Sequence, residues 1–190
     1  MFSDDVIQDM NRLACFLSFD QTNGRGITGK PSLLILLGNA ILPTAEAVFQ
    51  ALAQGKVSQL LIAGGVGHST DLLYQAVQAH PRYQHIATAG RSEAEILNDI
   101  GVQCFGISPE QILLETASTN CGDNALQARR VLDVAGDTHV HITLPQDPTL
   151  QFPTYPTFRS AWHERPDVTF VNRPASVPQL AREGEGTRFA

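Results

Sequence analysis

The chain of 190 residues is long enough for one domain with a sizeable hydrophobic core. Its formal net charge of -6 and the lack of any Lys/Arg block argue against nucleic acid as a partner. The acidic start is unlike a secretory signal, no apolar run approaches the ~18 residues of a membrane span, and the 3 cysteines lack metal or redox spacing. These features predict a cytoplasmic protein that does not insert into a membrane.

Residues 1–20 predict an N-terminal helix. Ser3 is placed to cap it, and two aspartates follow in the first turn, where the helix dipole favours negative charge. The apolar residues of this helix share one face: Val6, Met10, Leu13, Ala14 and Leu17. Packing on the domain is the ordinary role of such a face, and a partner-binding surface is the alternative.

Beyond a glycine-containing connection, apolar runs alternate with helix-period patterns. The runs predict strands at 32–37, 59–63, 112–114, 139–144 and 168–171, and the patterns predict helices at 44–54, 70–79, 91–100 and 125–134. Pro153 and Pro156 are expected to break the helical pattern of 149–163, and the tail 181–190 is expected to fray. The alternation predicts a single α/β domain over residues 1–190, a three-layer α/β/α sandwich with a mainly parallel, Rossmann-like sheet.

Polar and glycine-rich segments directly follow the predicted strands. Because ligands of such sheets bind outside the carboxyl ends of the strands, these segments should meet at one edge. They are Gly38-Asn39, the loop Gly64 to Thr70, Glu115 to Asn120, and Gln146-Asp147. The glycine loop could hold an anion through its N–H groups, but it matches neither the dinucleotide fingerprint nor the Walker A motif, and a tight turn explains it equally well.

Two glutamates are candidate catalytic residues. Ser92 and Glu95 have the spacing of a capping box, which leaves Glu93 free to face the crevice; a first-turn acid that suits the helix dipole is the alternative. Glu115 directly follows an apolar strand, so its carboxylate is either satisfied by hydrogen bonds in the interior or functional.

Amide and imidazole side chains are further candidates. Asn120 and Asn124 lie four residues apart on a predicted helix and could orient a ligand, although an ordinary cap and a surface amide are the alternative. His68 lies in the glycine loop and could contact a ligand there, although a loop residue hydrogen-bonded to backbone is the alternative. His139 and His141 point to one face of a strand, but no third ligand has suitable spacing, so no metal site is predicted.

The order of these motifs resembles the YdcF-like family of bacterial proteins, and most closely its soluble members. The matching segments are 36–40, 64–70, 91–94, Glu115, 118–125 and 146–149. The resemblance implies a Rossmann-like domain that binds S-adenosylmethionine, with no methyl transfer established, and for the envelope members a role in polyprenyl-phosphate or cell-wall precursor metabolism. It implies that the ligand-binding residues are Gly38, Asn39, Gly64, Gly65, Gly67, His68, Ser69, Thr70, Ser118, Asn120, Asn124, Gln146 and Asp147, together with Glu93 and Glu115.

The chain departs from the family in two places. Pro153 and Pro156 replace a regular basic helix, which argues against Arg159 as a site residue. The family also has a longer C-terminal part, and a lid formed by that part would be missing here.

The expected function is binding of a nucleoside-containing small molecule such as S-adenosylmethionine. Hydrolysis or transfer at a phosphate ester, with Glu93 or Glu115 as general base, is the alternative, and a non-catalytic scaffold is the third. Carboxylates beside the glycine loop would repel a phosphate unless a cation intervenes, which favours a cationic ligand. The sequence predicts no particular oligomeric state.

Overall fold

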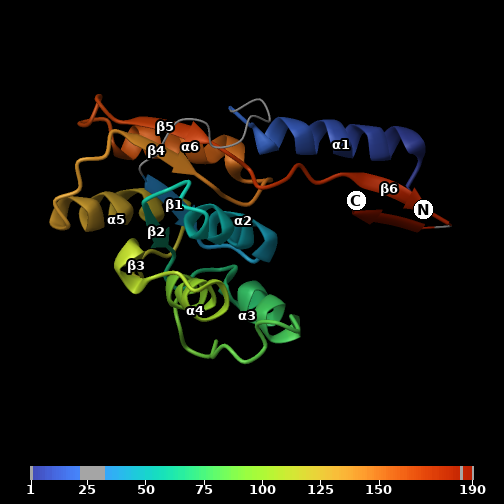
Figure 1. Cartoon of the computed structure of the whole chain (residues 1–190). Coiled ribbons are helices and arrows are strands. Elements are labelled where there is room, and N and C mark those ends of the chain that lie inside the picture. Colours follow the sequence, from blue (N-terminus) through green and yellow to red (C-terminus); the bar gives the residue numbers. More distant parts are fainter. Residues whose placement is uncertain (1, 22–32, 185, 190) are drawn as a thin grey trace.

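The computed structural model describes residues 2–21, 33–184 and 186–189 (Figure 1). Its centre is a five-stranded sheet in the order β3-β2-β1-β4-β5, in which all neighbouring strands are parallel. The strands are β1 Leu33–Leu37, β2 Gln59–Ala63, β3 Ile112–Glu115, β4 His141–Leu144 and β5 Thr169–Asn172. The expected parallel sheet is confirmed.

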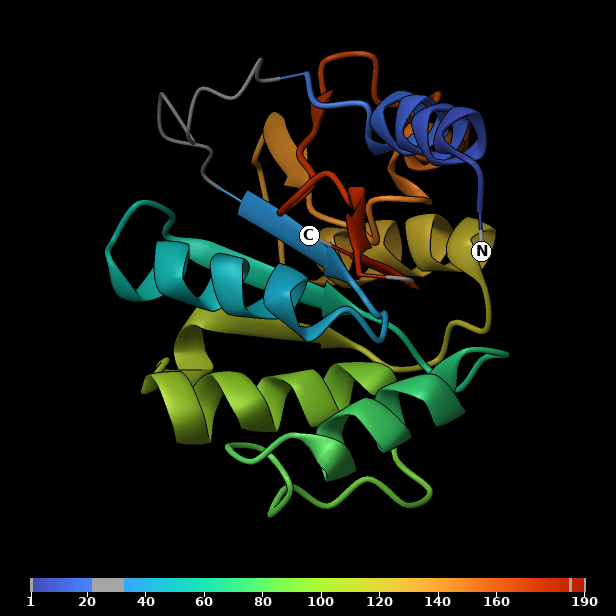
Figure 2. The same ribbon diagram turned by 90° about the vertical axis from the view of Figure 1, so that its right-hand side faces the viewer.

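Helices cover the sheet on both faces and complete the three-layer sandwich (Figure 2). One face carries α2 Leu42–Ala53, α3 Thr70–Ala79 and α4 Glu93–Phe105; the other carries α5 Cys121–Val134 and α6 Gln151–Ala161. A short 3-10 turn, η1 Pro109–Gln111, leads into β3. The central strand β1 is buried along its whole length, and its side chains alternate between the two cores, as the uninterrupted aliphatic run predicts.

The expected break at the two prolines is wrong, because α6 is one continuous helix. Pro153 is its third residue, where a backbone N–H would have no partner within the helix. Pro156 does remove one hydrogen bond, but the helix is held by burial of its inner face. Phe158 of that face meets Phe170 of β5 edge-on, with ring centroids 5.4 Å apart.

The expected fraying of residues 181–190 is also wrong for its described part. Strands β6 Leu180–Glu183 and β7 Gly186–Phe189 form an antiparallel hairpin that lies along helix α1 Asp4–Ser18 (Figure 1). The Asn11 amide accepts from the Leu180 N–H at 2.7 Å and donates to its carbonyl at 3.0 Å, and so pairs with the strand as a backbone would. Because the sequence gives no sign of this long-range contact, the hairpin was missed.

Helix α1 begins at the predicted cap, where the Ser3 hydroxyl accepts a hydrogen bond from the Val6 N–H. The helix buries Ile7 and Ser18, whereas Val6, Met10 and Leu13 are 41%, 40% and 56% exposed. The predicted apolar face is therefore covered only in part: its remaining members, Ala14 and Leu17, are half-buried, and the helix contacts α6. Nowhere in those residues does a helix have the length and apolar character required to cross a membrane.

Candidate functional site

The carboxyl ends of β1, β2 and β4 border a pocket of about 340 Å³, in the position expected for a parallel sheet. Every predicted site residue except Thr70 and Glu115 lines it. The predicted residues that line it are Gly38, Asn39, Gly64, Gly65, Gly67, His68, Ser69, Glu93, Ser118, Asn120, Asn124, Gln146 and Asp147. The structure thus brings together segments from four separate loops.

The glycines allow the strand ends to lie directly against the first turn of α4. A Cβ on Gly38 would lie 2.1 Å from the Glu93 Oε2 atom, and one on Gly64 would lie 3.1 Å from the Glu93 Cβ. The first-turn N–H groups of Glu93 and Ala94 donate to the carbonyls of Gly65 and Gly64 at 3.0 and 2.8 Å. This close approach is the structural reason for glycine here.

The glycine N–H groups are already used within the protein. Those of Gly38 and Gly64 donate to the carbonyls of Ala63 and Glu115 at 2.8 and 3.0 Å. The Gly65 N–H donates to the Ser118 hydroxyl at 3.2 Å, and the Gly67 N–H donates to the Thr70 hydroxyl at 2.8 Å. The glycine N–H groups are therefore not free to bind an anion, and the tight-turn alternative explains the glycines themselves.

Glu93 is the buried acid of the pocket. The capping box that was expected to release it is present, with the Ser92 N–H donating to the Glu95 carboxylate at 2.8 Å and the Glu95 N–H donating to the Ser92 hydroxyl at 3.3 Å. Glu93 is only 6% exposed, and this burial raises its pKa, while hydroxyl donors from Thr70 and Ser69 act in the opposite direction. The Thr70 hydroxyl donates to Glu93 Oε1 at 2.9 Å from outside the pocket lining, so Thr70 positions Glu93 and is not placed to contact a ligand.

Glu115 does not lie in the pocket, which contradicts its assignment as a candidate general base. The side chain is 3% exposed, and its Oε1 accepts from the N–H groups of Ala117 and Ser118 at 2.6 and 2.9 Å. Its Oε2 accepts from the Ser118 hydroxyl at 2.5 Å, and the same hydroxyl receives the Gly65 N–H. Glu115 thus fixes the loop between β3 and α5 against the glycine turn.

The three asparagines differ in how much hydrogen-bonding capacity they have left. Asn39 accepts from the Ile41 N–H at 2.9 Å and donates to the Leu37 carbonyl at 2.8 Å, and Asn120 caps α5 by accepting from the Asp123 N–H at 3.0 Å. The Asn124 amide is 7% exposed and lines the pocket, yet it makes no hydrogen bond with any residue that the structure describes. The helix cap is Asn120, so capping does not explain Asn124. The free Asn124 amide is therefore the one best placed to bind a ligand.

The residues that follow β4 also line the pocket. The buried Gln146 accepts the Asp147 N–H at 2.7 Å, and Asp147 accepts from the N–H and hydroxyl of Thr149 at 2.8 and 2.7 Å. Asp147 and Glu93 are the charged groups of the lining, which includes no Lys or Arg among the described residues. His68 is exposed at the rim. The pocket is therefore negatively charged when both carboxylates are ionised.

Sequence reasoning missed several residues of this pocket. Cys121, the first residue of α5, lies beside both acids, and its pKa is raised by burial first and then by the carboxylates of Glu93 and Asp147. This shift favours the protonated thiol, which is a weaker nucleophile than the thiolate. The sequence did contain one indication of this placement, because Cys121 directly follows Asn120, a predicted site residue. The exposed apolar side chains at the pocket edge were also missed: Ile41, Leu72 and Leu150.

Other candidates lie elsewhere. His139 interacts with Asp137 and His141 with Thr169, and the described residues contain no group of three His, Cys, Asp or Glu side chains that could hold a metal ion. The Arg159 guanidinium donates to the Val168 carbonyl at 2.7 Å and does not line the pocket. No protein-family model matches the chain.

Proposed function

We propose that the pocket at the strand ends binds a small molecule that combines a nucleoside with a positive charge, such as S-adenosylmethionine. The observation that carries this proposal is the charge of the lining: two carboxylates, Glu93 and Asp147, with no basic side chain among its described residues. Burial makes ionisation of an isolated carboxylate unfavourable, which is why the Glu93 pKa is raised. A bound cation would offset this cost by its attraction to the ionised Glu93.

The other features of the pocket suit the remaining parts of such a ligand. Its volume of about 340 Å³ is within the range of small-molecule sites. The apolar side chains at its edge offer a surface for a base, and the unpaired Asn124 amide lies in the first turns of α5, where the helix dipole favours the carboxylate of an amino acid. The resemblance to the YdcF-like family implies the same ligand.

Hydrolysis or transfer at a phosphate ester is the second candidate function. The raised pKa of Glu93 favours it, because a general base works best when its pKa is near the working pH. The glycine N–H groups, however, are occupied, and the two carboxylates would repel a phosphate. This function therefore requires a cation that accompanies the substrate.

Glu93→Gln is expected to weaken S-adenosylmethionine much more than S-adenosylhomocysteine, as measured by titration calorimetry. The two ligands differ by the charged sulfonium, and a close charge contact at an effective dielectric constant of about 20 contributes up to ~4 kcal/mol before desolvation. In the wild type, affinity for S-adenosylmethionine should rise with pH as Glu93 ionises, and this rise should occur at a pH above 4.5 because the Glu93 pKa is raised from that value. In the variant this pH dependence should be lost.

The stability of the same variant provides a check on its folding. Folding raises the pKa of Glu93, so ionisation of this residue above pH 4.5 favours the unfolded chain and lowers stability. Glu93→Gln should therefore be more stable than wild type at neutral pH. Below pH 4.5, where Glu93 is neutral in both states, this advantage should be absent. The matched control is Glu95→Ala, which removes the capping box and should cost about 1 kcal/mol of stability without altering either affinity.

Other outcomes separate the candidates. An equal loss for both ligands would contradict the charge-based proposal. Turnover of a phosphate ester that Glu93→Gln abolishes, without binding of S-adenosylmethionine, would favour the hydrolase. A protein that binds and turns over neither ligand class would favour the scaffold.

A further inference from the structure

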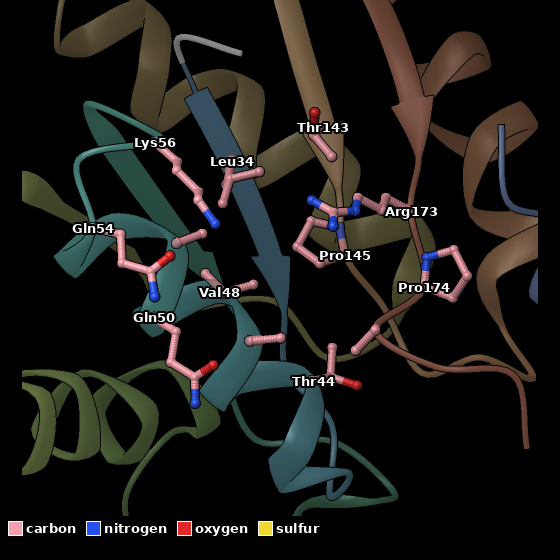
Figure 3. A pocket seen from close by; sticks show the side chains of 13 residues that line it. Leu34, Thr44, Val48, Gln50, Gln54, Lys56, Thr143, Pro145, Arg173 and Pro174 are labelled. Atoms are coloured by element: carbon pink, nitrogen blue, oxygen red, sulfur yellow. The ribbon is translucent and has the colours of Figure 1, made fainter. Parts of the chain in front are cut away.

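A second pocket of about 350 Å³ opens on the α2 face of the sheet (Figure 3). Helix α2 borders one side, and the segment that follows β5 borders the other. Its floor includes Leu34 of β1 and Thr143 of β4, which are register partners in adjacent strands. Val48 of α2 and Pro174 add apolar surface to the walls.

The charge of this pocket is opposite to that of the first. Lys56, just beyond α2, and Arg173, just beyond β5, both point into the space above Leu34 from opposite sides (Figure 3). Neither side chain forms an ion pair or hydrogen bond with a residue that the structure describes, and no Asp or Glu is among the described lining residues. Two unpaired cations in one pocket stand out in a chain whose net charge is -6.

One polar atom in the wall of this pocket is buried without a described partner. Thr44 lines the same pocket, is fully buried, and its Oγ1 has no hydrogen-bond partner among the described residues. Because this hydroxyl has no accessible surface, a ligand in the pocket would not contact it, and the features that favour a ligand are the two cations and the shape of the pocket.

We propose that this second pocket binds a small organic phosphate. The phosphate group lies between Lys56 and Arg173, whose charges it neutralises, and the apolar part of the ligand rests on Leu34, Val48 and Pro174. This site is separate from the first pocket, because no described residue lines both. The two are close to each other along the chain: Pro145 lines the second and Gln146, the next residue, lines the first.

The test is a calorimetric titration of the full chain with phenyl phosphate, which joins a dianion to an apolar ring. Lys56→Ala and Arg173→Ala are each expected to weaken binding by about tenfold or more, because each removes a charged hydrogen-bond donor. The control cation is Arg12→Ala, a 68%-exposed side chain on α1 outside the second pocket, which should leave affinity unchanged. Benzyl alcohol, which lacks the charge, should bind more weakly than phenyl phosphate.

Asn124→Ala distinguishes the two pockets and should not affect phenyl phosphate binding. Since Lys56 and Arg173 are exposed or half-buried and make no bonds with described residues, their variants should fold, which thermal unfolding verifies. Absence of measurable binding, equal affinity in wild type and both cation variants, or a loss confined to Asn124→Ala would each overturn the proposal. The last result would also assign the phosphate to the first pocket and favour the hydrolase alternative.

Discussion

Glu115→Ala is expected to lower the free energy of unfolding by about 3 kcal/mol, because it leaves three donors, two of them buried, without an acceptor. These are the N–H groups of Ala117 and Ser118 and the Ser118 hydroxyl, all within 2.9 Å of the carboxylate. Glu115→Gln keeps the shape and an acceptor oxygen, so its loss should be smaller. Urea unfolding of the variants measures both effects.

The control for Glu115 is Glu110→Ala, an exposed acid in the 3-10 turn before β3, which should change stability little. At temperatures where Glu115→Gln remains folded, it should bind S-adenosylmethionine nearly as well as wild type. If the Glu115 variants kept their stability but lost binding of S-adenosylmethionine, Glu115 would be a ligand-binding residue and would not serve to hold the loop after β3.

Gly65→Ala is expected to destabilise the protein by about 3 kcal/mol, the upper part of the usual range for overpacking. The added Cβ would lie 2.2 Å from the Ser118 carbonyl oxygen and 2.7 Å from that of Thr116. Both atoms belong to backbone that Glu115 holds in place, so neither can move as the end of a flexible side chain could.

The matched control for Gly65 is Gly122→Ala in the first turn of α5. Among the described residues a Cβ there meets the Asn120 Oδ1, at 3.3 Å, and alanine is the better helix former, so a change of no more than about 1 kcal/mol in either direction is expected. Thermal unfolding compares the two variants. If Gly65→Ala proved as mild as Gly122→Ala, the turn would not be packed tightly against the loop after β3.

The sheet and the pocket at its carboxyl edge could be predicted because they depend on local patterns. The aliphatic run of β1 marks a strand buried on both faces, and the strand-then-polar-loop order places Asn39, Asn124 and Gln146 at one edge by a general rule of parallel sheets. The capping box that separates Glu93 from Glu95 is likewise a spacing of three residues within one helix turn.

What could not be predicted depends on contacts between distant segments. Whether Glu115 serves the fold or the site is decided by the path of the loop behind it, which turns back so that its N–H groups meet the carboxylate. The Gly65 N–H is taken up by Ser118, 53 positions further along the chain. Leu150 contributes to the pocket because α6 forms despite its prolines, and no local pattern indicated that.

Binding of S-adenosylmethionine in the pocket at the strand ends can be tested residue by residue. The most direct measurement is the change of backbone amide shifts when ¹⁵N-labelled protein is titrated with this ligand. We predict saturable shifts centred on the glycine loop at 64–70 and on the first turns of α5 at 121–124, with Glu93 among the affected residues. Absence of shifts at saturating ligand, or shifts centred instead on Lys56 and Arg173, would contradict binding in this pocket.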